Sequence, residues 1–295
     1  MDAKNSKKKW AARRESLGRA WYRYSRNKLS VFGLIVVLAV IFIALFAEYI
    51  VPYPLHAGAF VDLGQAGLPP GDGHLLGTDQ YGRDIFSRIL FSFRGALLMG
   101  FGVLAVTVPV GVVLGLIAGY FQDSIVQPLI MRTVDIFLAL PPLVLALAVS
   151  AVLKPTLFNS LMAVSFAWWA WYTRLTYSMA SSLRNEFYIQ SAELIGSGKI
   201  HILVREILPN CMAPILTKMT LDMGWVILIG ASLSFVGMGE QPPKPALGTM
   251  VSDGAQYLPH MWWLAVFPAI AIMIIVLAFN LSGDGVRDML STEEV

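Results

Sequence analysis

Ionisable side chains inside long apolar stretches are the residues of this chain whose types and spacing suggest chemistry. Lys218 and Asp222 are four residues apart in one apolar stretch. In another, Arg132 and Asp135 are three apart. These spacings place two side chains on one face of a helix, so we expect each pair to form an ion pair. Ionisable groups within a membrane span suggest function by default, and for Lys218 and Asp222 a structural ion pair near the inner interface is the equally weighted alternative.

Catalytic and metal-binding motifs are absent from the sequence. The four histidines, at positions 56, 74, 201 and 260, lack the spacing that metal sites use. There is no G-x-S-x-G sequence for a nucleophilic serine and no Walker motif for ATP phosphates. The Gly-rich, charged segment HLLGTDQYGRD (residues 74–84) lacks the Gly-Lys-Ser/Thr ending and the preceding strand of a phosphate loop. We therefore expect no catalytic residue, no metal, no bound cofactor and no ATP hydrolysis by this chain alone.

The composition is typical of a membrane protein. Hydrophobic residues make up 56% of the 295 residues and charged residues 14%, where a soluble domain has about 25% charged residues. Several apolar windows exceed the roughly 18 residues that mark a membrane span. We predict an all-α polytopic protein, because a β-barrel would alternate polar and apolar residues instead. The six transmembrane helices are placed at residues 30–51, 96–120, 129–153, 161–179, 215–235 and 263–281.

The charge distribution predicts the orientation of the chain. Ten of the 22 Lys and Arg residues lie in the first 28 positions, against the two acids Asp2 and Glu15. Cytoplasmic loops carry an excess of Lys and Arg, so the N-terminus is expected in the cytoplasm, and six spans return the C-terminus to the same side. A nucleic-acid-binding arm is the weaker alternative directly before a span. The single cysteine, Cys211, excludes an intramolecular disulfide and fits a cytoplasmic loop.

These assignments divide the chain into five parts. They are a cytoplasmic basic segment (1–29) on the inner leaflet, a first transmembrane helix (30–51) read as an uncleaved anchor, an extracytoplasmic segment (52–93), a core with five further spans (94–283) and a cytoplasmic tail (284–295).

The extracytoplasmic segment ends in a charged helix. We expect Thr78 or Asp79 to cap this helix. Its water-facing side is expected to carry Arg83, Asp84, Arg88 and Arg94.

Two features predict how the spans pack. Gly111, Gly115 and Gly119 repeat every four residues, which places small residues on one helix face and allows close helix contact in lipid. Pro141 and Pro142 should break the third span near mid-depth, and broken backbone at membrane depth is tolerated where it faces protein or a water-filled cavity.

The most polar stretch of the second half, residues 183–214, lies between two spans. It reads as two short helices joined by a Gly196-Ser197-Gly198 turn, the second ended by Pro209. Helical spacing gives the second helix an apolar and a polar face. The apolar face comprises Ile200, Leu203, Val204, Ile207 and Leu208, and the polar face Lys199, His201, Arg205 and Glu206. Such a hairpin either lies at the membrane surface or forms a docking site.

This stretch resembles the EAA loop of ABC-importer permeases. That pattern has a Glu-Ala-Ala triplet, three intervening residues, a glycine, nine further residues and a short stretch that ends in Leu-Pro. Gln190-Ser191-Ala192 occupies the triplet, with departures at its first two positions, Gly196 is the glycine, and Leu208-Pro209 closes the pattern. The coupling loop implied by the resemblance comprises Gln190, Ser191, Ala192, Glu193, Gly196, Lys199, Arg205, Leu208 and Pro209.

Further segments resemble the second-permease (C-type) subunits of bacterial oligopeptide, dipeptide and nickel importers, and the resemblance extends over residues 27–288. They are HLLGTDQYGRD (74–84), MRTVDIFLALPP (131–142), LSFVGMGEQPPKPALGTMVSDG (233–254) and FNLSGDGVRD (279–288).

The resemblance implies a type I ABC-importer permease fold in the bacterial inner membrane. It also implies the partners: a second homologous permease, two ATP-binding subunits that hold ATP and Mg, and an extracytoplasmic substrate-binding protein. This chain would form half of the translocation pathway, and the hairpin would transmit movement of the ATPases to the spans. Candidate gate or pathway residues are Asp135, Pro141, Pro142 and Asp222. Candidate docking residues for the binding protein are Asp79, Arg83 and Asp84.

Other transported solutes and other protein classes remain as alternatives to a peptide importer. The same family handles nickel or metal chelates and opine-like solutes. A gradient-driven secondary transporter would need internal repeats or a buried chain of acids. A membrane-embedded enzyme would need a polar catalytic cluster at depth, which the sequence does not contain.

Overall fold

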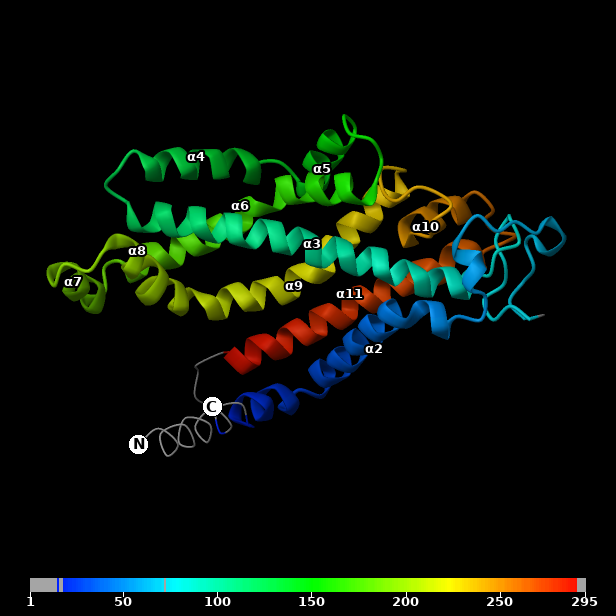
Figure 1. Ribbon diagram of the computed structural model, residues 1–295, viewed down its shortest axis with the longest axis horizontal. Helices are drawn as coiled ribbons and strands as arrows, with labels where there is room; N and C mark the ends of the chain where they lie inside the picture. Colours follow the sequence, from blue (N-terminus) through cyan, green and yellow to red (C-terminus); the bar gives the residue numbers. More distant parts are fainter. Residues whose placement is uncertain (1–14, 16–17, 72, 291–295) are drawn as a thin grey trace.

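The computed structural model describes residue 15, residues 18–71 and residues 73–290. Long helices run side by side in an elongated bundle, with a small helical hairpin at one end and irregular loops at the other (Figure 1). The elements are α2 (Lys28–Ile50), α3 (Ile85–Tyr120), α4 (Val126–Leu138), α5 (Pro142–Ser150), α6 (Leu157–Leu183), α7 (Phe187–Leu194), α8 (Lys199–His201), α9 (Leu208–Phe235), α10 (Leu247–Ala255) and α11 (Trp263–Leu290). Residues 18–26 are helical ahead of α2, whereas residues 1–14 and 16–17 of the basic segment and 291–295 of the tail lie outside the described residues.

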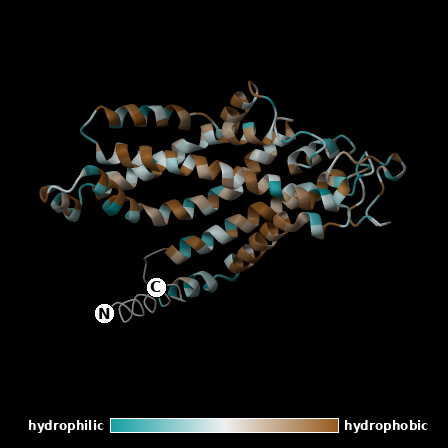
Figure 2. Cartoon of the chain, viewed as in Figure 1, coloured by the Kyte–Doolittle hydropathy of each residue, from teal (hydrophilic) through white to brown (hydrophobic). Residues whose placement is uncertain are grey.

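Most of the expected spans are helices of membrane-crossing length and composition. Four stretches qualify: α2, α3, the continuous helical stretch Lys199–Phe235, and α11. α4 and α5 qualify together as a bent fifth span. The expected fourth span lies within α6, whose Ser, Thr and Tyr residues make it less apolar than the others. Figure 2 shows hydrophobic residues along the long helices and more hydrophilic residues toward the ends of the bundle.

The repeated glycines of α3 lie against α6, as their spacing predicts. A Cβ atom on Gly115 would lie 2.6 Å from the Cβ of Thr176, and one on Gly119 would lie 2.6 Å from the Cβ of Ala180. Gly111 faces the backbone of α6 at similarly short range. Because these positions lack side chains, the two helix backbones approach closely along one seam.

The third span is broken where the two prolines stand. α4 ends at Leu138 and α5 begins at Pro142, and their axes differ by 88°. Pro141 has an extended ψ of 130°, and Pro142 occupies the first turn of α5, where a missing N–H costs nothing. The predicted break is therefore confirmed.

The predicted cap of the charged outer helix was wrong. The charged outer helix starts at Ile85, and its N-cap is Asp84, whose Oδ2 accepts a hydrogen bond of 2.7 Å from the backbone N–H of Ser87. Thr78 and Asp79 belong instead to the preceding loop, where Asp79 accepts two backbone N–H groups within the turn. α11 extends to Leu290, so that the segment assigned to the tail is helical over 284–290.

The seam between α3 and α6 gives a matched test of packing. Gly115→Ala should lower thermal stability in mild detergent by about 1–3 kcal/mol, because the new methyl group would overlap α6. Gly95→Ala, in the same helix, places its methyl group in open space and should be neutral or stabilising, since alanine favours helix over glycine by about 1 kcal/mol. Equal melting temperatures for the two variants would show that the seam does not require glycine.

Candidate coupling and transport sites

The helical hairpin formed by α7, α8 and the π-helical turn Ile202–Ile207 extends beyond the ends of α3 and α6 (Figure 1). Its two arms meet at Gly196, whose φ of +88° lies in the left-handed region that favours glycine. No atom outside the local backbone lies within 4 Å of a Cβ built on Gly196. The glycine expected from the EAA-like pattern therefore serves the turn rather than a close contact.

Three isoleucines attach the hairpin to the bundle. Ile189, Ile202 and Ile207 are each at most 1% exposed. They pack in one apolar cluster with Leu116 of α3 and Ile215 of α9. The hairpin is thus fixed to the ends of two long helices by side chains from both of its arms.

The apolar face predicted for the second arm was partly wrong. Ile207 is buried and Leu203 and Leu208 are half-buried as expected, but Ile200 is 79% exposed and Val204 52% exposed. The cause is the π-helical turn, because its wider spacing aligns residues five apart, Ile202 and Ile207, on the buried side.

Pro209 does not end the second arm, contrary to the sequence-based expectation. The chain remains helical from Lys199 to Phe235, with Pro209 in the first turn of α9. The π-helical turn Ile202–Ile207 precedes Pro209, and local changes of helix type such as this one provide partners for the backbone groups that a proline leaves free. The hairpin arm therefore continues directly into α9.

Polar contacts hold the rest of the hairpin in place. The Tyr120 hydroxyl donates a hydrogen bond of 2.6 Å to Glu193 Oε1. Lys199 Nζ lies 5.2 Å from the centre of the Phe121 ring. Both contacts join the hairpin to the end of α3.

The first two triplet side chains donate to nearby backbone oxygens of the same segment. Gln190 Nε2 donates to the backbone oxygen of Asn185, just before α7, at 3.1 Å. Ser191 Oγ donates to the backbone oxygen of Phe187 at 2.8 Å. Ala192 is half-buried against the isoleucine cluster, whereas Arg205 is exposed.

Large apolar side chains cover the outside of the hairpin. Phe187, Leu194, Ile195 and Ile200 are each at least 79% exposed. The buried isoleucines of the hairpin already make its contact with the bundle, and these exposed side chains take no part in that contact. An exposed apolar surface of this kind is typical of a protein–protein or membrane contact.

A partly buried ion pair lies in the middle of α9, as the spacing predicts. Lys218 Nζ lies 3.1 Å from Asp222 Oδ1, and the indole N–H of Trp168 donates to Asp222 Oδ2 at 2.9 Å. Asp222 is 5% exposed. Both carboxylate oxygens are therefore occupied, as a buried charge requires. Sequence spacing does not predict the contact between Trp168 and Asp222, because the two residues are 54 positions apart.

In the second predicted pair, the main partner of the carboxylate is a residue distant in the sequence. Asp135 of α4 forms its main ion pair with Arg174 of α6, through Arg174 Nη2 and Asp135 Oδ1. The predicted partner, Arg132, lies 4.0 Å from the other oxygen and is largely exposed. The carboxylate thus joins two helices instead of stabilising one.

The expectation of a water-facing row of charges on the outer helix was wrong for Arg83, Asp84 and Arg88, and the docking residue Asp79 is buried as well. None of the four is more than 7% exposed. Arg83 Nε binds Asp79 Oδ2 at 2.7 Å, and Arg88 Nε lies 3.7 Å from the same oxygen. Buried charges persist where they are paired, so these side chains hold the outer loops together. Arg94 is substantially exposed and pairs with Glu48 at 2.8 Å.

Two histidines complete this outer cluster. His74 Nδ1 lies 2.9 Å from Asp84 Oδ1, and His56 Nδ1 accepts the backbone N–H of Asp84 at 2.9 Å. Burial lowers the pKa of His56 below its usual 6.5, and the carboxylate of Asp84 opposes this shift. His56 is therefore held neutral as a hydrogen-bond acceptor. Among the described residues, no group of three or more His, Cys, Asp or Glu side chains is arranged to hold a metal ion.

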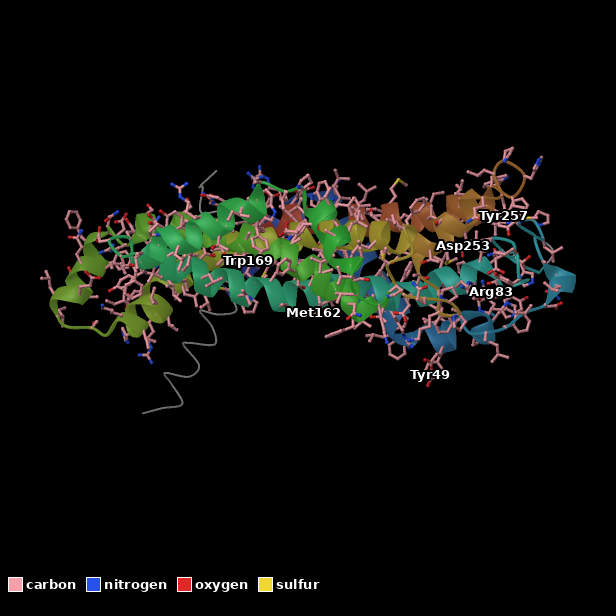
Figure 3. The ribbon with its side chains drawn as sticks, turned by 90° about the horizontal axis from the view of Figure 1, so that it is seen from above. Tyr49, Arg83, Met162, Trp169, Asp253 and Tyr257 are labelled. Atoms are coloured by element: carbon pink, nitrogen blue, oxygen red, sulfur yellow. The ribbon has the colours of Figure 1, made fainter. Side chains whose placement is uncertain are left out.

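An outer cavity of about 480 Å³ lies beside this cluster and is lined by Arg83, Arg88 and, from α10, Asp253 and Tyr257. Arg83, Asp253 and Tyr257 lie near one end of the molecule (Figure 3). Burial raises the pKa of the Asp253 carboxyl, and the two arginines oppose that shift. A second cavity, of about 540 Å³, lies between the hairpin-proximal part of α9 and the end of α11, and Lys218 and Asp222 line it.

Fold and site together define a class: a multi-span helical membrane protein with ion pairs between its spans and a helical hairpin outside the bundle. Residues 111–293 match the family described as binding-protein-dependent transport system inner membrane component. Residues 16–70 match the N-terminal TM domain of oligopeptide transport permease C.

Curated relatives match over most of their length. The dipeptide transport system permease protein DppC of Escherichia coli K12 is 43% identical over 92% of this chain and 91% of the relative. The di/tripeptide transport system permease protein DppC of Pseudomonas aeruginosa is 38% identical over 92% and 90%. A structure of the MetNI methionine ABC transporter in an inward-facing conformation shares the fold, with a TM-score of 0.50 and 16% identity over 68% of this chain and 93% of that one.

The chain belongs to the family of binding-protein-dependent transport system inner membrane components. It is an ABC-transporter permease subunit and a multi-pass protein of the inner membrane, which confirms the resemblance inferred from the hairpin motif and the four further segments.

Acidification should destabilise the outer cluster through His56. The folded state disfavours protonation of His56, so its contribution to stability is present above about pH 6.5 and is lost as the pH falls toward the lowered folded pKa. We expect a lower melting temperature at about pH 5.5 than at about pH 7.5. His56→Asn keeps an acceptor near Nδ1 but cannot titrate, so it should show a smaller difference. An unchanged pH difference in His56→Asn would contradict this assignment.

Proposed function

We propose that this chain is one of two permease subunits of an ATP-driven peptide importer and forms half of its translocation pathway. In this proposal it has six spans with both termini in the cytoplasm, and α6 is the fourth span. The dipeptide permeases to which the chain is similar support peptides as the transported class.

The observation that carries the proposal is the hairpin, which has an anchored side and an exposed side. Ile189, Ile202 and Ile207 fix it to the bundle, while Phe187, Leu194 and Ile195 face outward. A rigid element with a free apolar surface can dock on a moving partner and pass that movement to the helices behind it. Here the partner would be a cytoplasmic ATPase, and α9 would receive the movement directly.

The proposal requires other subunits beside this chain. Two ATP-binding subunits would hold ATP and Mg and hydrolyse it, since the sequence of this chain contains no Walker motif. A second, homologous permease would supply the other half of the pathway. An extracytoplasmic binding protein would deliver the peptide to the outer loops.

The outer cluster has a supporting role in this scheme. Asp79, Arg83 and Asp84 are buried, so a docking binding protein would contact the loops that these residues brace rather than their charged groups. The segment 237–261, which contains α10, would form part of the same face, because Arg88 Nη1 lies 3.4 Å from the backbone oxygen of Pro243.

The candidate gate residues fall at two places. Pro141 and Pro142 form the bend between α4 and α5, and Asp135 ties α4 to α6. Straightening this span would displace α5, so the bend would set the width of the pathway. Asp222 lines the cavity beside α9.

The function is tested by purification and reconstitution. The tagged chain should be recovered from mild detergent with a second permease and one or two ATPases. In proteoliposomes with its binding protein, this complex should import a dipeptide only when ATP is present. Uptake of a nickel chelate or an opine, but not of dipeptides, would show that the transported class is not peptides. A chain that purifies alone and transports its solute with an ion gradient would contradict the proposal of an ATP-driven importer.

The exposed hairpin surface predicts a specific assembly defect. Leu194→Glu should weaken recovery of the ATPases about tenfold or more, because it places a charge at the centre of the apolar contact. Val152→Glu, at the turn after α5, changes an equally exposed apolar residue and should leave recovery unchanged. Both variants should appear in the membrane in equal amounts. Equal recovery of the ATPases with the two variants would contradict docking through this surface.

A further inference from the structure

In the Lys218–Asp222 pair, the carboxylate accepts a hydrogen bond at each of its oxygens, whereas the ammonium group still has donors without a partner. Asp222 accepts from Lys218 Nζ through one oxygen and from the Trp168 indole through the other. An ammonium group carries three donors, and Lys218 uses one of them on Asp222. Two donors of Lys218 therefore remain to be directed elsewhere.

The position of the ammonium group is fixed by its surroundings. Besides Asp222, it lies 5.7 Å from the ring centre of Trp171 and 5.4 Å from that of Tyr172. Lysine is normally a flexible, strongly hydrated cation, so holding it between a carboxylate and two rings removes much of the entropy cost of binding a further group.

Lys218 lies at the edge of a cavity large enough for a small ligand. The cavity of about 540 Å³ includes Lys218 and Asp222 of α9 and Arg287 of α11 among its lining residues. Two cations against one anion give it a positive balance, and both oxygens of the anion already accept hydrogen bonds. Apolar groups complete the wall, among them Leu221 and Trp225. A positive centre within an apolar wall suits a small organic anion.

We propose that Lys218 binds the terminal carboxylate of a peptide during its passage, with Asp222 as the positioning residue that holds the ammonium group toward the cavity. This inference rests on the proposed function and specifies the part of the substrate that this subunit recognises. The apolar wall would receive the adjoining side chain without selecting it, so peptides of different sequence would share the contact. Arg287 would add to the attraction for negative charge.

The position of Lys218 on α9 would couple carboxylate binding to movement of the hairpin. Lys218 is ten residues beyond Leu208 in α9, which corresponds to about 15 Å of helix. Movement of the hairpin would therefore shift the ammonium group together with α9. Carboxylate binding and ATPase docking would act on the same rigid helix.

The test uses the assembled transporter with its ATPases, without binding protein, in phosphatidylcholine nanodiscs that contain no anionic lipid. A cysteine is placed at Thr217, which lines the cavity, in a Cys211→Ala background. The rate of its reaction with a maleimide is measured at increasing dialanine and dialanine amide. A cysteine at Val152, remote in sequence and highly exposed, is the control for general effects.

Dialanine should slow labelling of the cysteine at position 217 but not of the cysteine at position 152. Dialanine amide should slow labelling at position 217 far more weakly. Lys218→Gln should raise the half-protecting dialanine concentration about tenfold, the value of one charge-assisted contact. Lys218→Arg should retain most of the protection. The matched variant Lys154→Gln, in the exposed turn before α6, should behave as the unmodified protein.

Equal protection by dialanine and its amide, or protection unaffected by Lys218→Gln, would overturn the proposal. Absence of protection in a complex that still imports dialanine with its binding protein would also overturn it while leaving the proposed function intact. Failure of that import would contradict the peptide function, and with it this inference.

Discussion

The attachment of the hairpin to α9 is the interaction on which the functional account depends. The π-helical turn Ile202–Ile207 continues the hairpin into α9 without a break and turns two isoleucines to the same side. Together with Ile189 from the other arm, they close an apolar cluster at the ends of the long helices. If this connection were flexible, the hairpin could move without moving α9. Because its side chains are closely packed, a displacement of the hairpin would also displace α9.

The bilayer environment explains why small residues and paired charges recur along the bundle. Lipid provides no hydrophobic drive for helix association, so α3 and α6 gain contact by close approach at Gly111, Gly115 and Gly119. The same environment makes unpaired charges costly. Asp222 therefore has partners on both oxygens, and Asp135 joins α4 to α6.

Sequence patterns predicted the features that depend on local chemistry. The glycine repeat, the proline break and the Lys218–Asp222 pair each follow from the spacing of neighbouring residues, and the structure contains all three. The patterns failed where distant segments meet: Arg174 and Trp168 are 39 and 54 residues from their partners. The buried face of the second hairpin arm was misassigned because a single π-helical turn changes the spacing on which such assignments rely.

The most direct test of the account is whether the hairpin and α9 move as one body. Spin labels at Val204 and Trp225, both exposed, report on this lever, and a third at Leu38 of α2 supplies a reference. In the assembled transporter with Cys211→Ala, trapping ATP should leave the 204–225 distance distribution unchanged and shift the 204–38 distribution. A shift between 204 and 225 with none between 225 and 38 would show a hinge at the joint and contradict the account.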